Sequence, residues 1–459
     1  MTSKQKIAVD QFVETYMRKE SIPGLSISLL QDGESHICSY GYANKAKKRP
    51  VSQNTLFEIG SLSKAFTLLG VLLLEHLGKI QMEDDIHKYI PWLHFQPAIA
   101  NQPIGPITIK DLLYHTSGIP FSTISSIPED SSDSAIEKAV KAACGCKLAY
   151  EPGQGSEYAS MNTNILAHVI ECASGMPYAS YMKNHIFIPL GLYHTYAGYN
   201  AIEEGSCLAA GYKYSFFAPR RYKSPRYDGN TPSAFILSCA ADMDRWIRVQ
   251  LGLADIDEPL RHCVAKSHEP QYALDHEPGF SLGAGWNIYK DHMYLRYLGR
   301  NPNYSSIILF DKRMQYGICI MSNVPTNTVF YLAENMLAAE SPHLMPASSI
   351  DYFQRADRVF SYVALIFGGS IVVQGAVLLS DLLQKRIIQL HVSNVWYYIA
   401  FLIYALLCNG ALAFLPSKLT GYKISSSKMI SVWGSSLINI SKLVVLLSNV
   451  LTLLVVLLL

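Results

Sequence analysis

The sequence predicts an α+β domain followed by a membrane region. Alternating apolar and polar residues indicate strands near the start of the chain (24–42) and again much later (284–321), whereas residues 61–280 are mostly helix and loop. The C-terminal part contains long apolar segments that are almost free of charge. We therefore expect an antiparallel sheet flanked by terminal helices, a helical subdomain, and three C-terminal transmembrane helices.

The sheet is predicted from two groups of strands. In the first group, Gln31-Asp32-Gly33-Glu34 separates two alternating runs and so predicts a hairpin. The second group lies between helices and charged turns late in the domain. One sheet built from both ends of the domain is the simplest closure. The predicted strands are 24–30, 35–42, 284–289, 293–298, 305–310 and 316–321, and the predicted terminal helices are 4–19 and 326–339.

Three C-terminal segments have the composition of membrane spans. Residues 359–380, 395–415 and about 443–459 are each long enough to cross a hydrocarbon layer of ~30 Å. The third segment is the weakest, because Lys442 and Asn449 interrupt it. The expected organisation is a globular domain at 1–345, a linker at 346–358 and the transmembrane region at 359–459.

Composition excludes several classes of function. The formal net charge is +2 and the basic residues form no stripe, so no nucleic-acid partner is expected. The nine cysteines lack the spacing of a metal site, and a domain of this size needs no disulfide scaffold. We expect free thiols, no metal and no organic cofactor.

Ser61-Leu62-Ser63-Lys64 is the strongest chemical motif. A hydroxyl and an amine three residues apart share one face of a helix, and an uncharged lysine can accept the serine proton during attack on a carbonyl. The same spacing occurs at Ser3/Lys6, Ser180/Lys183 and Ser425/Lys428. Only Ser61 follows a glycine and opens a long apolar helix, where free backbone N–H groups favour negative charge.

Tyr158 is the candidate for proton transfer to the leaving group. It follows the turn-forming run Glu151-Pro152-Gly153-Gln154-Gly155 and precedes a helix expected at 164–173. The chain has 29 tyrosines, so the position carries weight only together with the other motifs. His115, in a His-Thr-Ser-Gly segment, is the other acid–base candidate, and we expect it to be structural.

Over about residues 5–340 the chain resembles the serine β-lactamase-like, penicillin-binding hydrolases of the class C type. The resemblance implies that Ser61 is the acylated nucleophile, Lys64 its base partner and Tyr158 the general base and acid. It also implies an oxyanion hole formed by the backbone N–H groups of Ser61 and of Ser306 on a sheet strand. Besides the Ser61 motif, the segments that carry it are 112–119, 152–158, 186–192, 238–243 and Asn323.

Two departures from that family pattern concern the substrate. Where relatives have Lys-Thr-Gly or His-x-Gly, this chain has Tyr297-Leu298-Gly299, and leucine can neither pair with a carboxylate nor donate a hydrogen bond. Substrates with a terminal carboxylate are therefore disfavoured, unless Arg300 substitutes. Ser160 is the second departure, at a position where Tyr-x-Asn would have asparagine.

With the C-terminal segments, these departures resemble the membrane-bound D-asparaginyl peptidases that activate peptide prodrugs, such as those that mature colibactin. That branch implies cleavage of an N-acyl-D-asparagine amide. We expect Tyr297 and Gly299 to line the site, and Ser160, Asn301 and Asn303 to bind the D-Asn side chain. The alternatives are a D,D-peptidase or esterase of the same fold, and a silent membrane-tethered sensor of cell-wall fragments or β-lactams.

The expected location is the cell membrane, with several spans in the lipid bilayer and possible homo-oligomers through them. Residues 1–20 are amphipathic and charged rather than a signal peptide. The positive-inside rule and the cysteine content favour a cytoplasmic catalytic domain. The resemblance implies an extracytoplasmic one, which we favour.

Overall fold

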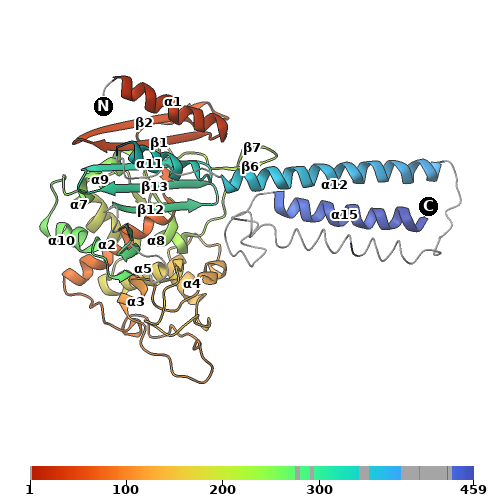
Figure 1. Ribbon diagram of the computed structural model, residues 1–459. Coiled ribbons are helices and arrows are strands. Elements are labelled where there is room, and N and C mark those ends of the chain that lie inside the picture. Colours follow the sequence, from red (N-terminus) through yellow and green to blue (C-terminus); the bar gives the residue numbers. More distant parts are fainter. Residues whose placement is uncertain are drawn as a thin grey trace. The chain divides into compact units, whose positions relative to one another are not determined.

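The computed structural model describes residues 3–273, 280–289, 294–340, 351–383, 403, 432 and 437–458. It divides into two compact units (Figure 1). Unit 1 comprises residues 1–212 and 221–349, and unit 2 comprises residues 213–220 and 350–459. Each unit is described by itself.

Unit 1 is built on an antiparallel sheet. Nine described strands follow the order β3-β2-β1-β14-β13-β12-β11-β10-β9. In this sheet β1 pairs with its hairpin partner β2 and with β14, so the start and the end of unit 1 meet. The predicted closure is confirmed. The strands are β1 (Gly24–Gln31), β2 (Glu34–Asn44), β3 (Arg49–Pro50), β9 (Tyr272–Ala273), β10 (Phe280–Gly283), β11 (Trp286–Tyr289), β12 (Tyr294–Asn301), β13 (Tyr304–Asp311) and β14 (Tyr316–Ser322).

Terminal helices accompany the sheet, as predicted. The hydroxyls of Tyr16 on α1 (Ser3–Lys19) and Tyr331 on α11 (Thr328–Glu340) lie 2.8 Å apart, and α11 contacts β13 and β14. Another helix, α9 (Ala240–Gln250), packs on β1 and β14. Every residue of β13 is buried, which requires cover on both faces of the strand.

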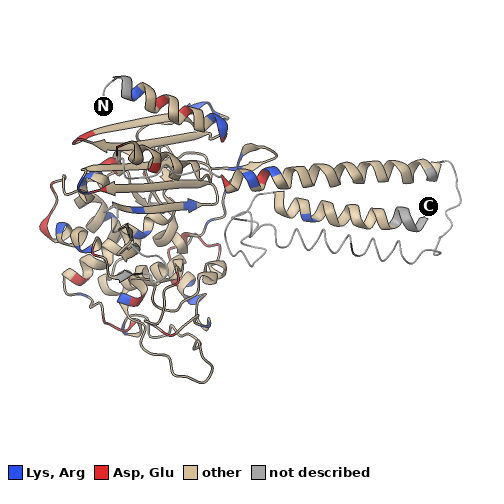
Figure 2. Ribbon diagram, in the orientation of Figure 1, with Lys and Arg blue, Asp and Glu red and all other residues tan. Residues whose placement is uncertain are grey.

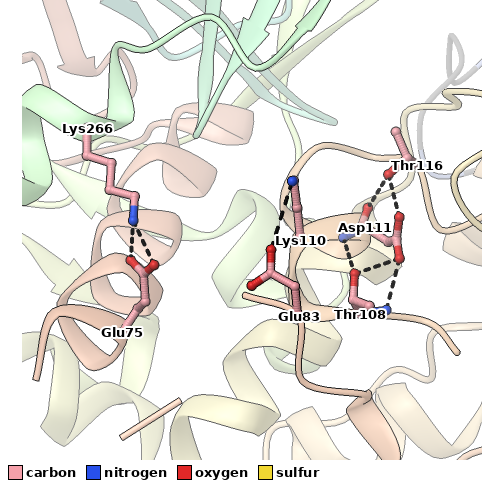
Figure 3. A network of polar contacts seen from close by, with 7 residues as sticks. All are labelled: Glu75, Glu83, Thr108, Lys110, Asp111, Thr116 and Lys266. Atoms are coloured by element: carbon pink, nitrogen blue, oxygen red, sulfur yellow. Dashed lines mark hydrogen bonds and ion pairs between the residues drawn. The ribbon is translucent and has the colours of Figure 1, made fainter. Parts of the chain in front are cut away.

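The helical subdomain is organised around α2 (Ser63–His76). Residues Ser63 to Leu74 of this helix are all buried, because α5 (Ser160–Ser174) and α10 (Glu258–Ser267) pack against it. Figure 3 shows Lys266 of α10 on Glu75 near the end of α2, with the shortest N–O distance at 2.6 Å. The other helices are α3 (Ile109–Leu113), α4 (Ala135–Lys141), α6 (Tyr178–Met182), α7 (Ile188–Leu190) and α8 (Thr231–Ala234).

A small second sheet was not predicted from the sequence. It has the order β4-β8-β5, from β4 (Phe57–Glu58), β8 (Ile236–Ser238) and β5 (Tyr196–Ala197). Strands of two or three residues are too short to give an alternating pattern. This sheet matters because β4 leads directly into the short helix η1 (Gly60–Leu62), which carries Ser61.

Unit 2 contains the hairpin β6 (Tyr212–Ser215) and β7 (Ala218–Arg221), both of which begin or end in unit 1, and two long helices. Helix α12 (Tyr352–Leu383) packs along α15 (Leu437–Leu458), where Ser441 Oγ donates to the Phe360 carbonyl at 2.9 Å. Within the described residues, one helical stretch, Tyr352–Ser380, is long and apolar enough to span a membrane, and Leu437–Leu453 is a shorter apolar stretch.

These helices differ in part from the prediction. Helix α12 begins at Tyr352, inside the segment expected to be a linker, because residues 352–358 continue the helical hydrogen-bonding pattern. Helix α15 begins at Leu437, also earlier than expected. The predicted span at 395–415 lies outside the described residues except for Ile403. Three transmembrane helices therefore stay a prediction.

The start of α3 gives a test of how the fold supports the nearby loop. Asp111 and Thr108 form a capping box, and Asp111 Oδ1 also accepts from Thr116 Oγ1 at 2.9 Å (Figure 3). Asp111→Ala removes both interactions, so we expect a loss of about 1 kcal/mol or more in unfolding free energy. Lys110→Ala is the control, because its contact with Glu83 is exposed and 4.0 Å long. Thermal unfolding should shift for the first variant and stay near wild type for the second.

Candidate active site

A tight turn presents Ser61 beside the large sheet. Gly60, which precedes it, has a φ of 55°, and a Cβ added there would lie 2.4 Å from the backbone nitrogen of Arg300 on β12. The Ser63 hydroxyl donates to the Gly60 carbonyl at 2.7 Å, and the Ser306 hydroxyl donates to the Ile59 carbonyl at 2.7 Å. Only glycine fits this close approach in this conformation. The turn is thus fixed from both sides.

Ser61, Lys64 and Tyr158 lie together. Ser61 Oγ is 2.8 Å from the Tyr158 hydroxyl and 3.4 Å from Lys64 Nζ. Ser61 is partly exposed, so a substrate can reach it, whereas Lys64 is fully buried. The residues that sequence analysis selected from three separate motifs therefore meet at one hydroxyl.

The surroundings of Lys64 favour an uncharged amine. Its Nζ donates to the Ser233 carbonyl at 2.9 Å and to Ser160 Oγ at 3.4 Å, and it lies 4.8 Å from the centre of the Tyr158 ring. Burial lowers the pKa of Lys64, and no carboxylate is among these partners. A neutral amine has two N–H donors for Ser233 and Ser160 and one lone pair. That lone pair is available for the proton of Ser61.

His115 supports Tyr158 as a neutral ring. Its ring centre is 5.0 Å from that of Tyr158, and its Nδ1 is 3.0 Å from Asn162 Nδ2 and 3.4 Å from the Ala159 backbone nitrogen. Both neighbours are donors, so Nδ1 accepts and the other ring nitrogen carries the proton. Burial, with a contribution from Lys64, lowers the pKa of His115 to about 3. His115 is thus neutral near pH 7.

Tyr297 faces the same cluster from β12. Its side chain is buried, and burial together with interaction with Tyr158 raises the pKa of Tyr297 well above the usual tyrosine range. The phenol therefore stays protonated. It places a neutral hydroxyl where the resembling family has a cation, and Leu298 follows it with no polar group.

The structure changes the expected oxyanion hole. Asn301 and Tyr304 close a two-residue turn, so alternate pairs from there, including Gly299 and Ser306, exchange the ladder hydrogen bonds. The N–H of Ser306 is thus used within the sheet, and its hydroxyl is used by Ile59. The N–H of Arg300 instead points away from β13, toward Gly60. We correct the pair of donors to the N–H groups of Ser61 and Arg300.

Three expected substrate-binding side chains have partners within the protein. The amide nitrogen of Asn301 donates to Glu58 and, at 2.7 Å, to the Ala234 carbonyl. The Asn303 amide donates to the Tyr222 carbonyl at 3.2 Å and packs against Gly211. Ser160 is buried at Lys64. Asn301 and Asn303 therefore hold the β12–β13 turn in place, which differs from the expected role.

Sequence reasoning also missed contributors to the site. The Ser233 hydroxyl donates to the Ser160 carbonyl at 2.7 Å and to Asn164 Oδ1 at 2.8 Å, while its own carbonyl accepts from Lys64. Asn162 orients His115 and accepts from the Ser117 hydroxyl at 2.8 Å. Ser233 lies in no recognisable motif, so only the fold could identify it.

Comparisons with known proteins agree with this geometry. The model of the beta-lactamase family matches residues 9–341. The chain belongs to the beta-lactamase family. It is 31% identical over 338 residues to protein flp of Staphylococcus aureus strain MRSA252, covering 73% of this chain and 66% of flp. It is 30% identical over 284 residues to a beta-lactamase of Pseudomonas fluorescens, covering 61% of this chain and 74% of that protein.

Solved structures show the same fold. The octameric penicillin-binding protein homologue from Pyrococcus abyssi superimposes with a TM-score of 0.64 at 24% identity, covering 78% of this chain and 81% of its own. The β-lactamase/D-alanine carboxypeptidase from Pseudomonas syringae gives a TM-score of 0.61 at 21% identity, covering 75% and 100%. With the family membership, the predicted class is confirmed: the protein is a serine hydrolase related to β-lactamases and penicillin-binding proteins.

Removing the Ser61 hydroxyl tests the nucleophile. We expect Ser61→Ala to abolish both turnover and covalent labelling by a fluorophosphonate, because no other hydroxyl of the cluster contacts Lys64 from a partly exposed position. Ser63→Ala is the neighbouring control and should still be labelled. Peptide mapping of the adduct to any residue but Ser61 contradicts the assignment.

Lys64→Met should separate activity from stability. Removing the amine should reduce turnover by several orders of magnitude, because nucleophile and base act as a unit. The same change should raise the unfolding temperature. A lowered pKa means that the folded state binds fewer protons than the unfolded state, so wild-type stability rises with pH below the ordinary lysine pKa. This part of the pH dependence should be absent in Lys64→Met, and an unchanged profile would contradict a neutral Lys64.

Tyr158→Phe tests proton transfer. The variant keeps the ring that contacts His115 and loses only the hydroxyl 2.8 Å from Ser61. We expect a rate loss of roughly 10²-fold or more with little change in thermal unfolding. Tyr297→Phe is the matched control for removing a phenol from the same cluster. Near-normal turnover of Tyr158→Phe would leave proton transfer to Lys64 alone.

Proposed function

We propose that this enzyme is a membrane-anchored peptidase that cleaves the amide of an N-acyl-D-amino acid through an acyl-enzyme on Ser61. One observation carries the proposal: the Ser61, Lys64 and Tyr158 cluster adjoins a strand that presents no cation for a substrate carboxylate. In the proposed reaction Ser61 attacks the carbonyl as Lys64 and Tyr158 take its proton. Tyr158 then gives a proton to the departing amine, and water releases the acyl group.

The Arg300 side chain, the nearby alternative anchor, is occupied elsewhere. Its guanidinium donates to Asn327 Oδ1 and lies 4.7 Å from the centre of the Phe330 ring. Tyr297 contributes a neutral phenol and Leu298 an aliphatic side chain. A free carboxylate bound here would therefore be left without a charged partner, which is costly in a buried site. An amide inside a longer chain fits better.

D-Asparagine is the proposed residue on the acyl side, as the resemblance to prodrug-activating peptidases implies. Because the amides of Asn301 and Asn303 have partners within the protein, we base this proposal on the resemblance alone. The P. syringae neighbour, described as a β-lactamase/D-alanine carboxypeptidase, keeps a D-Ala peptidase as the second candidate. An esterase or a silent sensor would share the fold but differ in turnover.

The proposal also places the enzyme at a membrane. The apolar stretch Tyr352–Ser380 has a mean hydropathy of 2.1, and Figure 2 shows its charged residues confined to the first turns of α12. We propose several spans with a catalytic unit outside the cytoplasm. Association through these helices into a homo-oligomer is a further part of the proposal.

Matched substrates test the missing carboxylate anchor. An acyl-D-Asn amide whose leaving group ends in a carboxamide should be cleaved at least as fast as the same compound ending in a free carboxylate. Acyl-D-Ala-D-Ala should be a poorer substrate than either. Arg300→Gln should leave this order unchanged. A strong preference for the free carboxylate that is lost in Arg300→Gln would instead support a carboxypeptidase.

Accessibility in intact cells tests sidedness. An impermeant thiol reagent should label the exposed Cys172 without lysis if the catalytic unit is outside the cytoplasm. Cys172→Ser is the control for labelling elsewhere. Protection of Cys172 until the membrane is broken would show a cytoplasmic unit and contradict the proposed placement.

A further inference from the structure

The hairpin β6–β7 has an unusual turn. Its central residues are Phe216, with a φ of 49°, and Phe217, with a φ of 66°. Hairpin turns with two positive φ values favour Asn-Gly, since other L-residues pay a steric cost there. Both rings are exposed, at 36% and 41%. A turn selected for folding alone has no reason to display two aromatic rings in a strained backbone.

The hairpin is attached to the start of the long apolar helix. The backbone N–H of Phe217 donates to Asp357 Oδ2 at 2.9 Å, and the Phe217 ring lies 5.0 Å from the Tyr362 ring. At its base, Lys213 is buried and donates to the Val432 carbonyl. These contacts explain why residues 213–220 group with α12 and α15 rather than with the sheet (Figure 1).

The contact falls at the level where the helix changes from charged to apolar. Arg355, Asp357 and Arg358 precede Val359, and the chain then runs without charge to Ser380. At 1.5 Å per residue that run spans roughly 33 Å, close to the thickness of a hydrocarbon core. Tyr362 lies about one turn inside it. Aromatic side chains favour this interfacial depth, where a ring is half in lipid and half in water.

We propose that Phe216 and Phe217 form a second membrane contact, in which the hairpin tip enters the interface of an anionic bilayer beside α12. The proposal rests on the membrane anchoring proposed above. Exposed Arg220 on β7, with exposed Arg355 and Arg358 on α12, supplies cations at the same level of unit 2. Phosphate head groups are their matching partners. Because β6 and β7 continue directly into unit 1, the inserted tip ties the catalytic unit to the bilayer at a second point.

Photo-crosslinking to lipid tests this contact. The full chain, with p-benzoylphenylalanine in place of Phe216, is placed in nanodiscs of phosphatidylcholine and phosphatidylglycerol, irradiated and analysed for lipid adducts by mass spectrometry. The probe keeps an aromatic ring at the turn, and thermal unfolding checks the fold. Tyr193, which is 66% exposed in unit 1, is the control that should give no adduct. Val372, which is 71% exposed on α12, reports on the helix itself.

Each outcome is decisive. Lipid adducts at positions 216 and 372, with none at 193, support the hairpin contact. Adducts at 372 without adducts at 216 overturn the hairpin contact and leave the membrane span standing. Adducts at 216 alone support the hairpin and overturn the span, and adducts at neither position overturn both. A protein adduct with a second copy of the chain at 216, in place of lipid, also overturns the proposal.

Discussion

The uncharged, buried amine of Lys64 is the constraint on which the rest of the site depends. Burial lowers the pKa of Lys64, and its described partners are a carbonyl, two hydroxyls and an aromatic ring rather than a carboxylate. A carboxylate here would restore the positive charge and remove the base. The fold thus accepts the cost of a buried lysine to obtain a lone pair beside Ser61.

Several parts of the fold keep that lone pair aligned. The close approach of Gly60 to β12 fixes Ser61, while Phe66 on α2 packs 4.4 Å from the ring centre of Trp246 and holds the helix that carries Lys64. Glu58, just before the turn, is fully buried with Tyr199 and Asn301, and burial raises its pKa to about 7. The polar groups around the nucleophile are therefore mostly neutral, which suits a site that develops charge only during reaction.

Sequence could predict the sheet and the nucleophile because both leave local signals. Alternation marked β1, β2 and β12 to β14, and the Ser61/Lys64 spacing stood at the start of an apolar helix. Other features depend on contacts distant in sequence. The Ser233 carbonyl reaches Lys64 from a short helix without a motif, and the use of the Ser306 N–H follows from strand pairing. Asn301 looked like a substrate ligand because its partner, Glu58, is far away in the chain.

Titration of Lys64 itself is the most direct test of this account. Nuclear magnetic resonance of protein labelled at the lysine side chains, with the Lys64 signal assigned by its absence in Lys64→Met, gives the pKa of that one amine. The account predicts a midpoint clearly below the ordinary lysine value of about 10.4. A Lys64 amine that stays protonated up to or above that value would contradict a neutral base beside Ser61.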